Sequence, residues 1–168
     1  MISGKDIATL RLIAAAGSDY DAIKRLVAET QWEIEEDEVD LGFLRIRIAD
    51  ATEESYRLII GYRDPDHPPY SLLTFSGFGQ FPDSEEHLAT FNSAFHSAAE
   101  VLTRHLGAPT TSGDRRSSFR KWSYAYQRWS LLEGEFTLVQ DEFDIQQGMD
   151  VTLWIQPVGT PVEKTLRL

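Results

Sequence analysis

Six carboxylates lie within eight consecutive positions of the sequence, in the stretch WEIEEDEVDLG at residues 32–42. Carboxylates at such density can bind a metal ion, transfer protons or attract a basic protein. The stretch lacks the alternating Asp/Asn order and the central glycine of a calcium loop, and its charges repel one another unless positive charges compensate. Such a run is most often a solvated, charged connection. A surface for a basic protein partner ranks second among the interpretations, and a metal or catalytic site ranks last. The carboxylates are Glu33, Glu35, Glu36, Asp37, Glu38 and Asp40.

The other titratable residues form no motif with a catalytic or metal-binding spacing. His96 and Glu100 are four positions apart on a predicted helix, and pairs of this kind arise often by chance. The turn DPDH at residues 64–67 combines two carboxylates with a histidine, but Asp-Pro is an ordinary turn signature. The glycines of FSGFGQF (75–81) complete no phosphate-binding fingerprint, and no serine lies in a G-x-S-x-G elbow. We therefore expect no metal, no cofactor and no enzyme activity.

A set of aromatic residues in the second half of the chain has two interpretations. Alternating aromatics in strands most often pack between a sheet and a helix, and this interpretation is favoured. A stacking platform for a sugar or single-stranded nucleic acid is the alternative. The residues are Trp122, Tyr124, Tyr126, Trp129 and Trp154.

The composition is that of a globular protein, and 168 residues suit one domain spanning 1–168. A net charge of −11 opposes binding to the phosphate backbone of nucleic acids. The excess lies in residues 1–103, which contain 8 basic and 19 acidic residues, whereas residues 104–168 contain 8 of each. The absence of cysteine excludes disulfides and thiolate chemistry. No segment approaches the roughly 18 apolar residues of a membrane span and no basic leader is visible, so we expect a cytoplasmic protein.

The hydrophobic pattern of the first 62 residues predicts two helices followed by strands. Apolar residues at helical spacing indicate a helix from Ser3 to a stop at Gly17, and Ser18 with Asp21 resembles the capping box of a second, short helix. After the acidic run the period becomes two, which predicts strands around residues 44–48 and 56–62 and a third strand at 70–78.

The clearest element is a helix over residues 84–106, capped by Asp83 or Ser84 and ended by Gly107. Its apolar stripe is expected to pack on the sheet. Residues 110–118 are predicted to form a polar loop, residues 119–126, 135–140 and 149–157 three more strands, and the tail a frayed or edge segment. The fold class is therefore α+β, with an antiparallel sheet of about six strands packed against a long central helix and an N-terminal helical pair.

Several of these features together resemble small immunity proteins of bacterial polymorphic toxin systems. They are the helical N-terminus, the long helix ending in LGAPT (106–110), Trp122 after a polar loop, and the final DVTLWIQP (150–157). The resemblance implies a non-enzymatic domain that binds and neutralises a toxin, and it implies no particular contact residues. The succession of helix, three strands, helix and strands also resembles type III secretion chaperones, although this chain departs from their pattern because it begins with a helical pair and does not end in a clear C-terminal helix.

The sequence thus predicts a protein-binding domain, with an immunity protein as its specific form and an effector-binding chaperone as the alternative. An acidic surface speeds the capture of a basic toxin, whereas a chaperone needs an exposed apolar groove for its client. We expect a protein partner, no nucleic acid and no membrane, and the sequence does not fix the oligomeric state. The predicted partner-binding residues are Glu35, Glu36, Asp37, Glu38 and Asp40.

Overall fold

The computed structural model describes residues 2–48, 57–61, 73–81, 85–116, 123–144 and 148–166. The helices are α1 (Gly4–Ala16), α2 (Tyr20–Ala28), α3 (Leu88–Leu106) and α4 (Val162–Thr165), with two 3-10 turns, η1 (Val39–Leu41) and η2 (Glu85–His87). The strands are β1 (Glu33–Glu38), β2 (Phe43–Arg47), β3 (Arg57–Ile60), β4 (Leu73–Phe81), β5 (Thr111–Arg116), β6 (Ser123–Ser130), β7 (Glu135–Asp144) and β8 (Gly148–Gln156).

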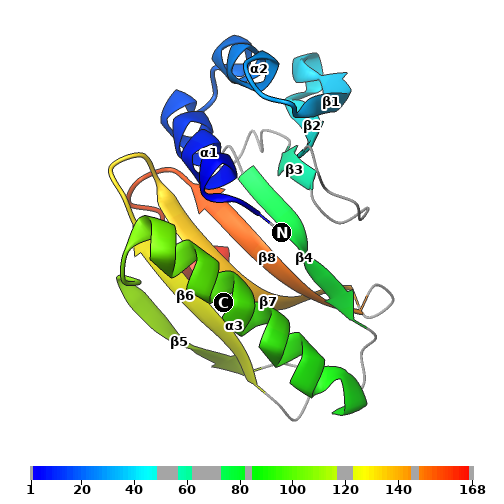
Figure 1. The fold of residues 1–168 in the computed structure, drawn as a ribbon, viewed down its shortest axis with the longest axis vertical. Coiled ribbons are helices and arrows are strands. Elements are labelled where there is room, and N and C mark those ends of the chain that lie inside the picture. The colour runs from blue at the N-terminus through cyan, green and yellow to red at the C-terminus, as the bar shows by residue number, and fades with distance from the viewer. Residues whose placement is uncertain are drawn as a thin grey trace.

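The described strands form one hydrogen-bonded series in the order β1-β2-β3-β4-β8-β7-β6-β5, and each neighbouring pair is antiparallel. In Figure 1, β1 to β3 are turned away from the strands β4 to β8, so the series has two arms that meet at β4. The predicted α+β class, the antiparallel pairing and the central helix are confirmed. The expected number of about six strands was too low.

Both additional strands lie in segments that the sequence assigned to connections. The acidic run forms β1, and residues 111–116 of the predicted polar loop form β5. Neither segment alternates between apolar and polar residues, because each is an edge strand that is largely exposed. Their pairing with an inner strand, rather than a hydrophobic pattern of their own, defines them.

The helical pair forms as predicted, but its caps differ in part. Ser3 caps α1, and the side chains of Ser3 and Asp6 complete a capping box with each other's backbone. The box expected at residues 18 and 21 is absent: α2 begins at Tyr20, so the residue before it, Asp19, is the cap and accepts a hydrogen bond from Ala22 N at 2.9 Å.

Helix α3 lies across the sheet and ends at Gly107 as predicted, where a φ of 87° is readily adopted only by glycine. It starts at Leu88 after the turn η2, and the expected caps at residues 83 and 84 lie outside the described residues. Its buried face carries Phe91, Phe95 and Leu102 from the predicted stripe. At 19 residues it is about 28 Å long.

Strand β4 ends later in the sequence than predicted. The sequence predicts that this strand ends at residue 78 and that the glycines of residues 75–81 turn the chain out of the sheet. Instead β4 continues to Phe81, and its register against β8 shifts between Ser76 and Gln80. Glycine in a strand often marks such a bulge, so here it bends the strand instead of ending it.

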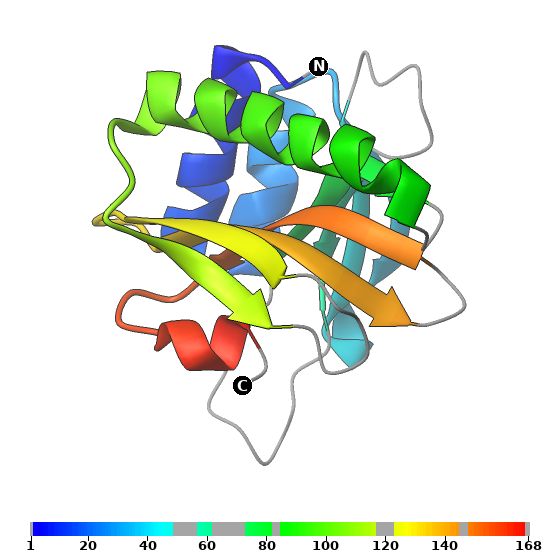
Figure 2. The ribbon, with the colours of Figure 1, turned by 90° about the horizontal axis from the view of Figure 1, so that it is seen from below.

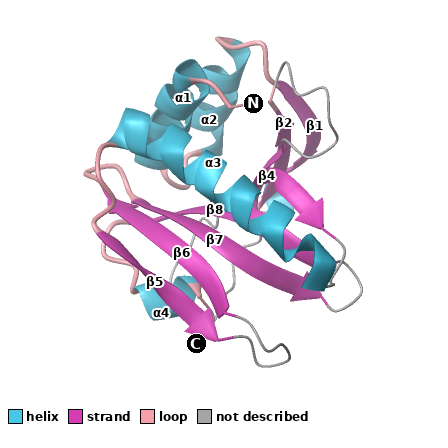
Figure 3. Ribbon diagram, turned by 60° about the horizontal axis from the view of Figure 1, so that its bottom comes forward, coloured by secondary structure: helices cyan, strands magenta, loops and turns pink. Residues whose placement is uncertain are grey.

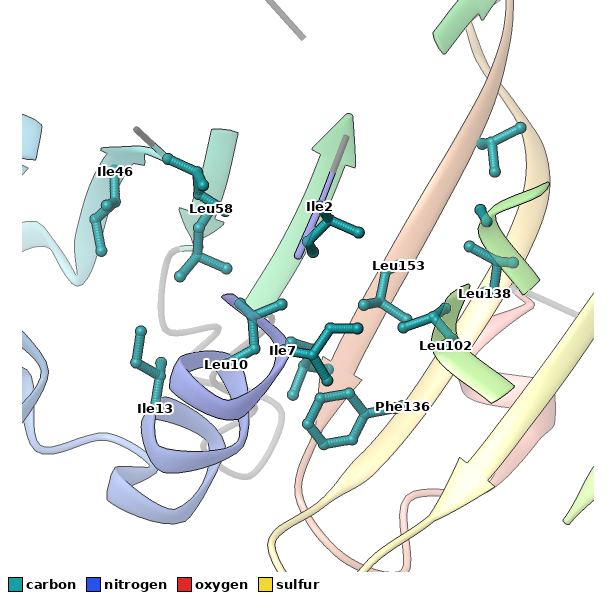
Figure 4. Close-up of a cluster of buried hydrophobic side chains, with 14 of the residues drawn as sticks. Ile2, Ile7, Leu10, Ile13, Ile46, Leu58, Leu102, Phe136, Leu138 and Leu153 are labelled. Carbon is teal, nitrogen blue, oxygen red and sulfur yellow. The ribbon is translucent and has the colours of Figure 1, made fainter. Parts of the chain in front are cut away.

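The main core lies between the helices α1, α2 and α3 and one face of the sheet (Figure 3). Figure 4 shows Ile7 and Leu10 of α1 close to Leu153 of β8 and Phe136 of β7, with Leu58 of β3 on the other side. These side chains are almost fully buried, so burial of apolar surface is the main stabilising contribution. Among the described residues, no helix combines the length and hydrophobicity needed to cross a bilayer.

The opposite face of the sheet carries α4, which replaces the expected frayed or edge tail (Figure 2). Trp154 and Leu166 belong to a small second apolar cluster there. Beside it the buried Arg128 guanidinium donates to Thr160 O at 2.8 Å and lies 3.8 Å from the buried carboxylate of Glu135. Burial lowers the pKa of Arg128, and the charge of Glu135 opposes this effect.

Candidate partner-binding surface

The acidic run forms an edge strand because arginines of the next strand lie opposite its glutamates. In the antiparallel β1–β2 register, Glu33 faces Arg47 and Glu36 faces Arg45. Cross-strand pairs of opposite charge stabilise a sheet, whereas like charges in these positions would destabilise it. Ile34 packs against the main core and fixes which face of β1 points inward. The run is thus an ordered strand and not a solvated connection.

Four of the six carboxylates form ion pairs within the chain. Glu33 pairs with Arg47 and Glu36 with Arg45, while Asp37 is 2.5 Å from Lys24 of α2. Partial neutralisation of the run by Arg45 and Arg47 is therefore confirmed.

Glu35 has the most extensive set of contacts. Arg57 of β3 donates to it twice, through Nε at 2.7 Å and Nη2 at 3.2 Å, and Arg47 Nε lies 3.5 Å away. The hydrogen bond from Arg57 lowers the pKa of Glu35 below its ordinary value of 4.5. Burial opposes this effect, and the charges of Arg57, Arg47 and Arg45 add to it. We call the carboxylates of residues 33, 35, 36 and 37, with their basic partners, the charge ladder.

The other two carboxylates, Glu38 and Asp40, lie at the turn of the β1–β2 hairpin. Both are exposed, and neither forms an ion pair with another described residue. Between Asp40 and the left-handed Gly42, the side chain of Leu41 is 62% exposed. Tyr20 of α2 donates to Gly42 O at 2.9 Å and so holds this turn against the helical pair. We call Glu38, Asp40 and Leu41 the hairpin tip.

The structure therefore brings all five predicted partner-binding residues onto one hairpin and divides them by environment. Three of them, Glu35, Glu36 and Asp37, belong to the charge ladder, and two belong to the hairpin tip. Their part in partner binding stays a prediction. Sequence reasoning missed Arg57, whose place in an alternating strand next to Arg45 and Arg47 could have indicated it, and Leu41, for which no sequence signal distinguished exposure from burial.

A second feature is a shallow hollow of about 500 Å³ between α3 and β6. It contains His96 and Glu100, the pair with metal-ligand spacing, together with Arg104 and Gln127. Within the described part of the chain, no group of three His, Asp or Glu residues is arranged to hold a metal ion. The lining of the hollow combines apolar surface with charged side chains of both signs. The DPDH turn lies outside the described residues.

The predicted aromatic set lies mostly in the interior, as the favoured interpretation stated. Tyr124 and Trp129 are buried in the main core, where Tyr124 meets Phe91 edge-to-face at 6.1 Å, and Trp154 is buried in the second cluster. An unbroken alternation of these aromatics predicts Tyr126 on the same face as Tyr124, and this prediction is wrong because Tyr126 packs on the second cluster.

The reason is a break in the β6 pattern. Ala125 N donates to the side chain of Gln140 at 2.9 Å, and regular pairing with β7 begins only at Tyr126. A stacking platform formed by the described members of the set is excluded, because its rings lie on opposite faces of the sheet. Trp122 lies outside the described residues.

Comparisons with known proteins give no family for this chain. No protein-family model matches it. No curated protein matches it either. Among solved structures it is similar to the solution structure of cyanobacterial PsbP (CyanoP) from Synechocystis sp. PCC 6803, with 11% sequence identity and a TM-score of 0.39. This similarity covers 80% of the present chain and 86% of CyanoP, and it is too low to bear on function.

Proposed function

We propose that this chain is a non-enzymatic binding protein that captures a basic bacterial toxin and neutralises it. The observation that carries the proposal is the hairpin tip, where Glu38 and Asp40 have no ion pair among the described residues and Leu41, next to Asp40 in the chain, is exposed. Exposed carboxylates close to an exposed apolar side chain match a partner that offers a small apolar pocket bordered by lysine or arginine.

The two kinds of residue at the tip would contribute to different steps of binding. Charges at the rim of an interface mainly raise the association rate, and the overall charge of −11 would add long-range attraction for a basic partner. A buried apolar contact mainly slows dissociation. The charge ladder, already neutralised by its arginines, would hold the hairpin in place rather than attract the partner.

Chaperoning of a secretion effector is the second candidate, and the described surface supports it less. A chaperone that wraps an unfolded client needs a continuous apolar groove. The large apolar side chains exposed in the described part are Leu12, Leu41, Leu132 and Val158, and the hollow between α3 and β6 is lined by Glu100 and Arg104 as well as by apolar surface. We also place the proposed activity in the cytoplasm, in keeping with a sequence that has no cysteine.

The experiment starts by isolating partners on the immobilised chain from the cells that produce it, in parallel with Glu38→Gln/Asp40→Asn. The matched control is Glu100→Gln/Asp114→Asn. It changes the net charge equally, but its residues lie on α3 and on β5, the edge strand opposite to β1. A basic protein retained by the wild type and the control, and retained poorly by the tip variant, is expected.

Neutralisation is then tested directly with the protein that was isolated. Its expression in a bacterial host should stop growth, and co-expression of this chain should restore growth. At low ionic strength the tip variant should associate about fivefold more slowly than the control, and the difference should shrink as salt is added. A retained partner that is harmless when expressed alone would refute neutralisation. An unfolded secretion effector as the partner would favour the chaperone.

A further inference from the structure

The outward face of α1 carries apolar side chains although it faces solvent, and Lys5 is the charged residue at its N-terminal end. Ala8, Leu12 and Ala15 are exposed at spacings of four and three residues, and Leu12 is 55% exposed. The opposite side of α1 is buried in the main core through Ile7 and Ile13. A surface helix normally places polar residues on its outward side, so a helix that is apolar on both sides is typical of one covered on both sides.

The turn between β6 and β7 lies beside α1 and exposes a further apolar side chain. Arg11 of α1 donates through Nε to Glu133 Oε1 of the turn at 3.0 Å, which places the two elements side by side. At this turn Leu132 is 97% exposed. Burial acts to raise the pKa of Glu133, but the hydrogen bond and charge of Arg11 outweigh it and the pKa is lowered. We call Ala8, Leu12, Ala15 and Leu132, with the Arg11–Glu133 pair, the α1 surface.

The local charge of the α1 surface differs from that of the whole chain. Helix α1 and this turn contain two basic residues, Lys5 and Arg11, and two acidic residues, Asp6 and Glu133, so they are neutral in a chain of net charge −11. Two copies of a strongly anionic chain repel each other over most of their surface. They approach at the lowest electrostatic cost where each is neutral and apolar.

We infer that the α1 surface is the contact between two copies of this chain in a symmetric dimer. In a two-fold interface the same patch faces itself, so each copy contributes one Arg11–Glu133 pair to the contact. A basic partner is a poorer match, because the carboxylates free to attract it lie on the hairpin tip. Figures 1 and 3 show the β1–β2 hairpin and the β6–β7 turn on opposite sides of α1, so one copy could use both surfaces at once.

The test is the molar mass of the full chain by sedimentation velocity and light scattering over a wide concentration series. The wild type should pass from 19.1 kDa at low concentration to twice that mass at high concentration. Leu12→Glu/Leu132→Glu should remain at the monomer mass throughout. The matched control, Leu41→Glu, makes the same change at an exposed leucine outside the α1 surface and should dimerise like the wild type. Circular dichroism and thermal unfolding establish that each variant is folded, since the substituted side chains are exposed.

A wild type that stays monomeric at every concentration overturns the inference, even if the α1 surface binds a different protein. An unchanged dimer in the double variant, or loss of the dimer in the Leu41→Glu control, overturns it as well. The result is independent of the proposed function, because a dimer can form whether or not the hairpin tip captures a toxin. Partner retention by the folded double variant should equal that of the wild type.

Discussion

Replacement of Glu35 by glutamine tests whether the charge ladder holds the β1–β2 hairpin in place. Glutamine has nearly the same shape as glutamate but lacks the charge that Arg57 and Arg47 surround. A charge-assisted hydrogen bond contributes about 1.5–3 kcal/mol when sheltered, and an exposed ion pair about 0.2–1 kcal/mol. The Glu35 and Arg57 side chains are 24% and 27% exposed and so lie between these limits. We expect Glu35→Gln to lower the free energy of unfolding by about 1.5 kcal/mol.

The assay is equilibrium unfolding in urea, since guanidinium chloride would screen the charges under study. Glu38→Gln is the matched control, because it removes the same charge from the same strand without breaking an ion pair. Its effect should stay within about 0.5 kcal/mol. The difference between the two variants should also decrease in high salt.

The pH dependence gives a second, independent readout. The pKa of Glu35 is lower in the folded state than its ordinary value of 4.5, so the ladder contributes its full stabilisation above that pH. The contribution is lost as pH falls through the lower, folded-state pKa, where the carboxylate is protonated in both states. The wild type and Glu35→Gln should therefore converge between about pH 7 and about pH 3. Equal stability of Glu35→Gln and Glu38→Gln at pH 7, or a gap that persists in acid, would refute the role of the ladder.

Three further substitutions test the rest of the fold. Leu102→Ala should cost about 3 kcal/mol of unfolding free energy in urea, because it opens a cavity at a fully buried site, and a cost under about 1 kcal/mol would contradict the packing of α3. Gly134→Ala should cost about 1–3 kcal/mol, since the added Cβ would lie 2.7 Å from the Gln156 carbonyl oxygen, and an unchanged melting temperature would show that the turn is looser. Glu135→Ala should cost about 3 kcal/mol by leaving Arg128 buried and unpaired, and hydrogen exchange should show faster opening of residues 159–166 than in the wild type.

Elements with a strong hydrophobic period were predictable from the sequence. The stripe of Phe91, Phe95 and Leu102 located α3, and the alternation of Leu44 and Ile46 located β2, because in both cases burial of one face determines the element. Strands β1 and β5 were missed because both are exposed edges, so their sequences carry little hydrophobic signal. A strand of this kind is determined by its neighbour's backbone and side chains, and those become opposite only when the chain folds.

The location of the candidate site was predictable from the sequence, but its division into the charge ladder and the hairpin tip was not. Sequence reasoning found the density of carboxylates and the nearby Arg45 and Arg47, since both are local properties of the chain. It could not assign partners across strands, because Arg57 reaches Glu35 only through the pairing of β2 with β3. The break in β6 at Ala125 was missed for a similar reason, as a side chain from β7 causes it.

The carboxylates of the charge ladder need neighbouring positive charges to hold the hairpin in place, whereas those of the hairpin tip must stay unpaired to attract a partner. The geometry of the hairpin satisfies both requirements. A carboxylate beside a neighbouring strand can meet an arginine of that strand, so Glu33, Glu35 and Glu36 are neutralised where β2 and β3 lie alongside them. Glu38, the last residue of β1, and Asp40, in the turn that follows, form no ion pair with another described residue. Repulsion between these two charges therefore persists in the isolated chain. A cationic surface that docks on the tip would relieve it, so removal of one tip carboxylate should slightly stabilise the free chain while it weakens the complex. A tip variant that is less stable than the wild type on its own would contradict this origin of the binding energy.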